Sequence, residues 1–460
     1  MTTQGFELRE ISLPPIGLPR DLPRVPGSTY EARIAATERA MADRGLAALV
    51  VYADREHFAN LAYLTGFDPR YEEALLILVP GRTPRLLVGN EDVAYADIID
   101  YDIDVVRFSK LSLTGQPDPD DLALADVLRE AGLSDLDTIG VVGWKWYAGA
   151  GTEGWIDVPH YIVVELARTA QRVVNAADIF TGFDGGLRYQ NEVDQIAYFE
   201  FVGAHGSQSI INLIDGIQPG MTELEASQLL RPLMLPFNYH PTMLGGPNTR
   251  FGVASAGSRE LQVGDRVASG LGYWGSNTAR AGYLVEHAAQ LPADAAGYVD
   301  DLVIPYFATA AAWYENVRIG MTAGEMYDVT FDRIGDPFFG IFLNPGHFIH
   351  LDEWPGSPVA KGSEVVFRSG NAIQLDIIPM VSSSAHHTSQ IEDGVVLADE
   401  ELRAELAEKY PGAWQRIQAR RDMLKTTFGI DLHDEVLPLS NAAGYLPPYW
   451  LAPNLAITRA

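Results

Sequence analysis

Two kinds of hydrophobic pattern alternate in the first part of the chain. Residues 29–53 (TYEARIAATERAMADRGLAALVVYA) begin with the three- and four-residue spacing of an amphipathic helix and end in a continuous apolar run. Further short runs rich in Val, Ile and Leu follow, separated by helical patterns such as residues 121–132 (DLALADVLREAG). Strands that alternate with helices predict an α/β domain. Two glycines and the charged segment after them predict that this domain ends near Leu187.

The remainder of the chain contains an internal repeat. Gly-Met-Thr followed by Glu three residues after the Thr occurs in residues 218–230 and again in residues 318–330. Each copy predicts a capping box, in which the two side chains bind the free backbone amides at a helix start. The pairs are Thr222/Glu225 and Thr322/Glu325. A β-rich segment led by glycine follows each copy, which predicts a pseudo-twofold α+β domain with sheets facing one another. The alternative is that Gly-Met-Thr is only a common helix start.

Composition and charge narrow the class of protein. A chain of 460 residues with 47% hydrophobic residues predicts two globular domains, which we place at residues 1–186 and 187–460. The formal net charge of −28, with no local cluster of Lys and Arg, argues against nucleic acid as a partner. The absence of cysteine excludes disulfides, thiolate metal sites and a cysteine nucleophile. We expect an extended Pro-rich start, draped over another domain or subunit.

Location follows from segments that the sequence lacks. No basic region followed by an apolar run marks an export signal, and no apolar stretch approaches eighteen residues. We therefore expect a cytoplasmic protein with no membrane partner.

Titratable side chains are concentrated in residues 344–358 (NPGHFIHLDEWPGSP). His347, His350, Asp352 and Glu353 lie close together there, among glycines and prolines. Paired carboxylates in a partly dry site raise one pKa, so that one group serves as a base and another as an acid near neutral pH. The alternative is a structural loop in which His and Asp bind each other and the backbone, with Trp354 packed underneath.

Further candidates lie in the strands and turns of the same half. Asp376 and Glu392 occupy apolar β-rich segments, where an ionised carboxylate is costly unless it is paired, so each is either a site residue or half of a buried bridge. His387 belongs to a Ser-rich hairpin tip that is either solvated or lines the cleft.

Residues 271–285 (LGYWGSNTARAGYLV) supply aromatic and polar candidates. Tyr273, Trp274 and Asn277 are placed on a ribbon facing the pocket, where aromatic rings hold a quaternary ammonium or sulfonium group by cation–π attraction. The alternative is that these aromatic residues belong to the core. Arg280 is expected to have a structural role.

Several segments between residues 30 and 399 resemble the creatinase, prolidase and aminopeptidase P group. They are FANLAYLTGF, IQPGMTELE, GGPNTRFG, GDRVASGLGYWGSNTARAGYLV, GHFIHLDEWP, IQLDIIP and QIEDGVVLAD. The resemblance implies a creatinase-like α/β N-terminal domain and a C-terminal domain with the pita-bread fold of methionine aminopeptidase. It also implies a homodimer.

Most members of that group bind two divalent metals through two Asp, one His and two Glu. The matching positions here are Gly270 or Ser269, the vicinity of Asn277, His347, Asp376 and Glu392. Neither Asp is present, so the resemblance implies no dinuclear metal centre and no other cofactor. His347, Asp376 and Glu392 are sufficient for at most one metal ion. The family's substrate-side histidine is also missing, because its place falls near Val253.

Two analogies suggest how such a site works. Creatinase hydrolyses a C–N bond without metal, although this chain lacks creatinase's histidine. The LDEWP segment resembles the DEYP segment of pita-bread dimethylsulfoniopropionate lyases, which implies that Asp352 is the base. Arg70, in TGFDPRYEE, matches a loop that projects into the partner subunit's active site, where it would bind a substrate carboxylate. Surface salt bridging is its alternative role.

These patterns predict a metal-independent hydrolase or lyase that acts on a C–N bond of a small amino-acid-like or zwitterionic molecule. The predicted catalytic residues are His347, His350, Asp352, Glu353, Asp376 and Glu392. The predicted substrate-binding residues are Arg70, Tyr273, Trp274, Asn277, Trp354 and His387. The alternatives are a metal-dependent Xaa-Pro peptidase, a dimethylsulfoniopropionate-type lyase and a non-catalytic binding protein.

Overall fold

The computed structural model describes residues 5–152, 154–381 and 389–460, which form two compact units. The N-terminal unit is Val25–Tyr189, and the C-terminal unit is Gln190–Ala460 together with Met1–Arg24. The boundary thus lies close to the expected one, but the start of the chain belongs to the other unit. The reason is visible in β1 (Phe6–Glu10), which pairs antiparallel with β15 (Leu455–Arg459).

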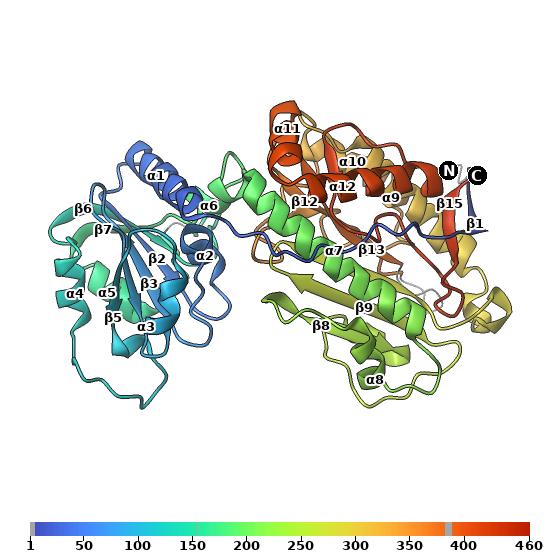
Figure 1. Cartoon of the computed structure of the whole chain (residues 1–460), viewed down its shortest axis with the longest axis horizontal. Helices are drawn as coiled ribbons and strands as arrows, with labels where there is room; N and C mark the ends of the chain where they lie inside the picture. The colour runs from blue at the N-terminus through green and yellow to red at the C-terminus, as the bar shows by residue number, and fades with distance from the viewer. Residues whose placement is uncertain (1–4, 153, 382–388) are drawn as a thin grey trace. The chain divides into compact units, whose positions relative to one another are not determined.

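The N-terminal unit is a six-stranded mixed sheet with helices on both faces (Figure 1). In sheet order its strands are β5 (Asp104–Arg107), β4 (Arg85–Val88), β3 (Ala74–Leu78), β2 (Ala48–Ala53), β6 (Leu136–Val142) and β7 (Ala170–Asn175). Its α-helices are α1 (Gly27–Asp43), α2 (Ala59–Thr65), α3 (Asp92–Tyr95), α4 (Leu124–Glu130), α5 (His160–Leu166) and α6 (Asp178–Thr181). Alternate residues of β2 enter two separate apolar cores, which explains the continuous apolar run in its sequence.

The C-terminal unit is built on one antiparallel sheet. In sheet order its strands are β11 (His347–Phe348), β12 (Ala372–Asp376), β13 (Gln390–Leu397), β10 (Ser276–Tyr283), β9 (Arg266–Tyr273) and β8 (Phe237–Gly245), with β14 (Val436–Pro438) also paired to β13. Its α-helices are α7 (Val193–Gly216), α8 (Glu223–Ser227), α9 (Ile304–Asn316), α10 (Ala323–Ile334), α11 (Glu400–Lys409) and α12 (Pro411–Met423). The two halves of the repeat join where β10 pairs with β13, so the expected facing sheets form one continuous sheet instead.

The predicted capping boxes are both present. Thr222 starts α8 and Thr322 starts α10, and in each case the hydroxyl accepts from the amide of the glutamate three residues on, whose carboxylate binds back to the threonine amide. Both threonines also bridge to a later segment, Thr222 to Glu260 and Thr322 to Val366. The repeat is therefore structural as well as sequential.

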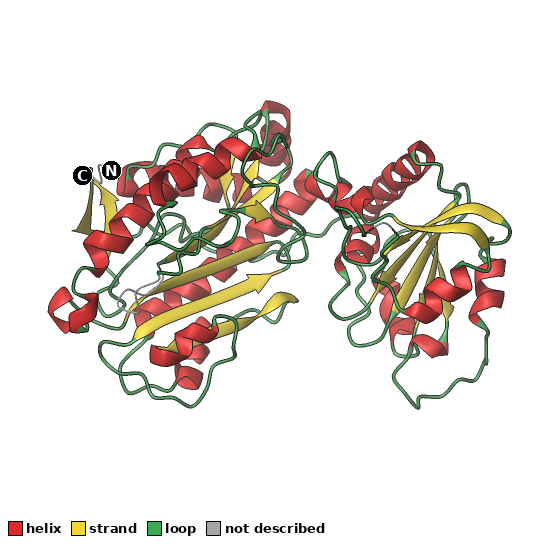
Figure 2. Cartoon of the chain, turned by 180° about the vertical axis from the view of Figure 1, so that it is seen from behind, coloured by secondary structure: helices red, strands yellow, loops and turns green. Residues whose placement is uncertain are grey.

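Helix α7 covers one face of the sheet. It packs against β9 and β10, and lies in front of the long strands in Figure 1 and behind them in Figure 2. A Cβ added at Gly206 of α7 would lie 3.6 Å from the ring of Tyr273 and 3.9 Å from the Thr278 hydroxyl. Because side chains alternate along a strand, the neighbours of these residues point to the opposite face. Gly270, Gly272, Asn277 and Ala279 therefore face away from α7.

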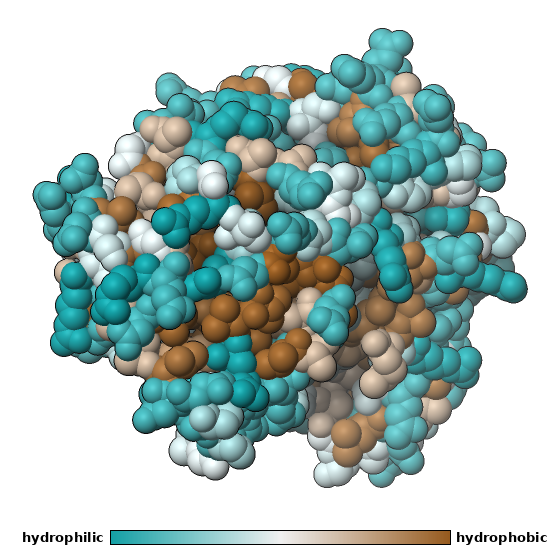
Figure 3. All heavy atoms as spheres, turned by 60° about the vertical axis from the view of Figure 1, so that its left-hand side comes forward, coloured by the Kyte–Doolittle hydropathy of each residue, from teal (hydrophilic) through white to brown (hydrophobic). Residues whose placement is uncertain are grey.

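The face of the molecule in Figure 3 is largely hydrophilic. Apolar side chains gather near its centre. None of the helices in the described ranges combines the length and the apolar character that crossing a bilayer requires.

Candidate active site

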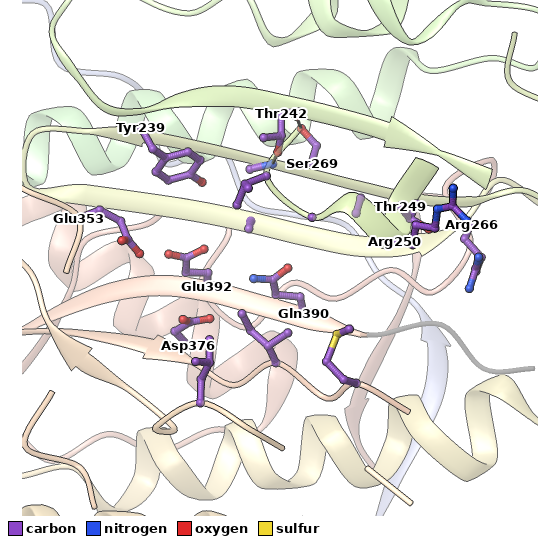
Figure 4. A pocket seen from close by; sticks show the side chains of 18 of the residues that line it. Tyr239, Thr242, Thr249, Arg250, Arg266, Ser269, Glu353, Asp376, Gln390 and Glu392 are labelled. Carbon is purple, nitrogen blue, oxygen red and sulfur yellow. Dashed lines mark hydrogen bonds between the residues drawn. The ribbon is translucent and has the colours of Figure 1, made fainter. Parts of the chain in front are cut away.

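A cavity of about 600 Å³ lies on the face of the C-terminal sheet away from α7. Its walls come from β8, β9, β10, β12 and β13, and from the loop that carries Glu353 and Trp354 (Figure 4). The sheet thus places residues that are distant in the sequence around one space.

One row of paired residues crosses the floor of this pocket. Asp376 lies opposite Glu392, Glu392 opposite Ala279, Ala279 opposite Gly270, and Gly270 opposite Thr242. Residues directly opposite one another in antiparallel strands share a face and lie about 5 Å apart at their Cβ atoms. The row therefore begins with two adjacent carboxylates and continues with two residues that carry almost no side chain.

His347 approaches the carboxylates from β11. Its Nδ1 donates to the Phe348 carbonyl at 2.8 Å, so Nε2 carries the lone pair of the neutral ring. That Nε2 lies 3.9 Å from Asp376 Oδ2 and 4.0 Å from Glu353 Oε1, and it is buried without a hydrogen-bond partner. The Trp354 ring stacks on the imidazole with centroids 4.1 Å apart. Burial lowers the pKa of His347 to about 4, which keeps the ring neutral.

The three carboxylates repel one another, and Asp376 and Glu392 are buried while Glu353 is partly buried. Burial raises the pKa of Asp376 to about 7 against a lowering hydrogen bond from Gln390. Burial, then the charges of Asp376 and Asp352, raises the pKa of Glu353 to about 7. Burial and the two neighbouring carboxylates raise the pKa of Glu392 well above its ordinary value. Such a cluster favours a cation or shared protons.

Tyr239 fills the space beside the row. A Cβ added at Gly270 would lie only 2.5 Å from the Tyr239 hydroxyl and 3.3 Å from Ala279 Cβ. Burial, then the charges of Glu392, Glu353 and Asp376, raises the pKa of that hydroxyl well above its ordinary value. The phenol therefore stays protonated and can donate a hydrogen bond toward the carboxylates or a ligand.

The donor set fits one metal ion but not two. One ligand atom each from His347, Glu353 and Glu392 lies within 4.8 Å of the other two. A neutral imidazole whose other nitrogen binds a backbone carbonyl is the usual form of a metal-ligating histidine. Gly270 and Ala279, in contrast, supply no ligand for a second ion. Glu353 thus joins His347 and Glu392 in this set, whereas the sequence suggested Asp376.

Comparison with known proteins identifies the architecture. Residues 33–146 match the Creatinase/Prolidase N-terminal domain family. The chain is similar to the prolidase of Pyrococcus horikoshii OT3, at 15% identity and a TM-score of 0.61, with 80% of this chain and 95% of that one covered. It is also similar to dipeptidase PepE from Mycobacterium ulcerans, at 20% identity and a TM-score of 0.61, covering 82% and 95%. Residues 33–146 thus form a domain of the creatinase/prolidase N-terminal type, and the chain as a whole shares the fold of these peptidases.

A third structure extends this similarity. A variant of Escherichia coli aminopeptidase P matches at 14% identity and a TM-score of 0.58, with 86% of this chain and 99% of that one covered. No curated protein sequence matches the chain. At these identities the solved structures establish the creatinase-like fold, with its pita-bread C-terminal domain, rather than an activity.

Within this creatinase-like domain, only some of the predicted catalytic residues meet. His347, Glu353, Asp376 and Glu392 converge, and Trp354 lines the pocket. His350 and Asp352 are buried but are not among the residues that line the pocket, and the His350 ring packs edge-on against Phe199. The expected roles of His350 and Asp352 at the pocket surface are therefore not supported.

The predicted aromatic wall requires correction. Tyr273 faces α7, stacks on Phe237 and binds the Leu233 amide through its hydroxyl, so it belongs to the core. Trp274 lies in the turn after β9 and is not a lining residue. Asn277 is fully buried one pair further along the strand, opposite Gly272, and its side chain lowers the pKa of Glu392. It supports Glu392 rather than contacting the cavity.

The last two candidates lie elsewhere. Arg70 belongs to the N-terminal unit, where its side chain binds the Tyr95 hydroxyl. His387 lies outside the described residues. Arg280 has the structural role expected for it, because it is fully buried and pairs with Asp393 at 2.5 Å.

Several residues that line the pocket were not predicted from the sequence. Tyr239 lies in a segment with no recognisable motif. Arg250, Arg266 and Gln390 lie within segments that resemble the family, but no role was predicted for them. The alternation of side chains along a strand could have predicted Gln390, because it lies two residues before Glu392 and so shares its face. Val253 also lines the pocket, at the place where the family's substrate-side histidine was expected.

Proposed function

We propose that this chain is a hydrolase that cleaves a C–N bond of a short peptide or a related amino-acid-like molecule, with a single divalent cation in its pocket. The observation that carries the proposal is the buried Nε2 of His347, which has no hydrogen-bond partner and faces Glu353 and Asp376. The fold shared with prolidases and aminopeptidase P supports hydrolysis, and the row with Gly270 and Ala279 supports one ion rather than two.

His347, Glu353 and Glu392 would hold the cation, which activates water and polarises a carbonyl when bound. Asp376 lies beside this set and is the candidate general base for the attacking water and general acid for the leaving nitrogen. Tyr239, which stays protonated, donates a hydrogen bond to the oxygen on which negative charge develops. Trp354 keeps the imidazole ring in place by stacking on it.

A second candidate is the same hydrolysis without metal. Asp376 and Glu353, each with a pKa near 7, support it because two such groups can exchange protons at neutral pH. In that case the positively charged part of the substrate neutralises the carboxylates. The two candidates differ in their need for an ion and share their catalytic residues.

Metal analysis separates them. We expect elemental analysis of the purified protein, incubated with Mn²⁺, Zn²⁺ or Co²⁺ and desalted, to give one equivalent per chain. His347→Ala should lose it, whereas His205→Ala, which removes a histidine bound to the Pro19 carbonyl, should keep it. Two equivalents per chain would contradict the single site. Activity that persists after chelation, with no metal bound, would favour the second candidate.

Activity is tested with a panel of Xaa-Pro dipeptides, longer peptides, N-substituted amino acids, guanidino acids and betaines, followed by mass spectrometry. Hydrolysis adds the mass of water across a C–N bond, whereas elimination gives an unsaturated product, as expected of a lyase. A compound that stabilises the protein and is recovered unchanged would instead indicate a binding protein. The homodimer and the cytoplasmic location stay predictions. Light scattering measures the molar mass in solution and so tests the homodimer.

A further inference from the structure

The pocket has a basic end as well as an acidic one. Arg266 begins β9, and Arg250 lies in the short helix Gly246–Phe251 that follows β8; both line the cavity. Figure 4 shows their side chains at the end away from Glu353. The cavity therefore has carboxylates at one end and guanidinium groups at the other.

The two guanidinium groups have no carboxylate partner in the described ranges. Neither Arg250 nor Arg266 forms an ion pair there, although the chain has 61 acidic residues against 33 basic ones. The nearby Arg259, in contrast, is held by both oxygens of Asp265, at 2.7 and 2.9 Å. The Arg250 guanidinium lies over the Phe251 ring at 4.6 Å. Both groups are thus available to bind an anion from solution, and guanidinium binds carboxylate with two parallel hydrogen bonds.

The strand register gives the separation of the two ends. The pairing of β9 with β10 is continuous from Arg266 to Tyr273, so Arg266, Ala268 and Gly270 share the pocket face. Four residues of strand at about 3.3 Å each place Arg266 roughly 13 Å from the carboxylate row, measured between Cα atoms. The wall between the ends is apolar and includes Ala268, Ile378 and Met380.

We propose that the pocket binds an extended substrate whose C-terminal carboxylate is held by Arg250 and Arg266 while its amino end lies at the carboxylate row. This inference rests on the proposed function and specifies its substrate class. A peptide of three or four residues spans the separation, because an extended chain covers about 3.3–3.6 Å per residue. Apolar side chains suit its middle.

The test uses ω-amino acids of increasing chain length as a molecular ruler, with n-alkylamines of equal length as partners that lack the carboxylate. Binding is measured by isothermal titration calorimetry on the full-length protein as purified. The amino group binds at the carboxylate row both as an ammonium ion and as a ligand of a bound cation, so the length dependence reports the separation in either state. These probes contain no hydrolysable C–N bond.

We expect affinity to rise with length for the amino acids, until the longer members bind about tenfold or more tightly than the matched amines. Arg266→Gln and Arg250→Gln should each abolish most of that difference and leave amine binding unchanged. Arg333→Gln, which removes a charge from the last turn of α10, is the matched control and should change neither. Circular dichroism of each variant checks folding.

The outcomes separate this inference from the function on which it rests. If amino acids and amines of every length bind equally, or if the arginine variants keep the full difference, the carboxylate subsite is refuted even when the enzyme hydrolyses peptides. If the length dependence and its loss in both variants are observed while no peptide is hydrolysed, the subsite stands and the hydrolase proposal fails.

Discussion

Replacing Glu392 by glutamine should stabilise the metal-free protein, because it removes one of the charges crowded at the row. Asp376 and Glu392 are direct cross-strand partners, which places their Cβ atoms about 5 Å apart. At that distance two negative charges repel by about 3 kcal/mol for an effective dielectric constant of 20. Taking up a proton at pH 7, against an ordinary pKa near 4.3, costs about 3–4 kcal/mol. Whether Glu392 stays charged or takes up a proton, its replacement should therefore raise the free energy of unfolding by about 3 kcal/mol.

The assay is thermal unfolding at pH 7 in excess EDTA and then with saturating Mn²⁺ or Zn²⁺. For a unit of this size about 3 kcal/mol corresponds to a rise of roughly 6 °C in Tm for Glu392→Gln in EDTA. Metal should then raise the Tm of the wild type by several degrees and that of the variant much less, since it has lost a ligand. Glu405→Gln, an exposed acid on α11, should change neither measurement.

Two results would refute this reasoning. A fall in Tm for Glu392→Gln in EDTA would mean that the carboxylate makes a net favourable interaction in the metal-free protein. An equal metal-induced shift in wild type and variant would remove Glu392 from the ligand set.

Three further substitutions test other parts of the structure. Glu200→Ala should lower the free energy of unfolding in urea by about 3–5 kcal/mol, because it leaves Arg420 buried without its carboxylate partner; a loss below 1 kcal/mol would contradict this. Asp92→Asn should stabilise the protein at pH 8 but not at pH 4. Burial and the charge of Glu72 raise the pKa of Asp92 to about 7. The wild type therefore loses stability as pH rises through that value, whereas the variant does not. Thermal unfolding across a pH series measures the difference in stability between variant and wild type, which should not exceed about 4 kcal/mol. A difference that is the same at every pH would argue against the shifted pKa. Gly270→Ala should cost about 1–3 kcal/mol by displacing Tyr239, and a neutral result would place the hydroxyl elsewhere.

The fold was predictable because its signals are local and repeated. The capping boxes at Thr222 and Thr322 depend on residues three positions apart, so the sequence contains the whole interaction. The continuous apolar run of β2 likewise reflects burial on both faces. The joining of two ribbons into one sheet depends instead on the pairing of β10 with β13, more than a hundred residues apart. No local pattern determines that pairing.

The site was predicted in part, and its errors have a common cause. His347, Asp376 and Glu392 follow from the family resemblance, and Glu353 from its place in the same loop. Tyr273 was assigned to the pocket, yet a shift of one residue along a strand exchanges the two faces, and only the register fixes which face is buried against α7. Tyr239 lies where the pairing of β8 with β9 is interrupted on both sides, so simple alternation does not place it.

The negative charge at the carboxylate row has no positive partner on the same face of the sheet among the described residues. Three carboxylates converge on its acidic end, and Arg280, a fully buried arginine of β10, faces the other side and is bound to Asp393. The positive charge at the row must therefore come from outside the chain, from a metal ion, from the amino group of a substrate or from bound protons. Metal titration of Glu392→Gln tests the first source, because the variant has lost a ligand. Binding of the ω-amino acids in excess EDTA tests the second source, because no metal ion is then present to hold the amino group. If neither a metal ion nor an amino group binds, bound protons are the source.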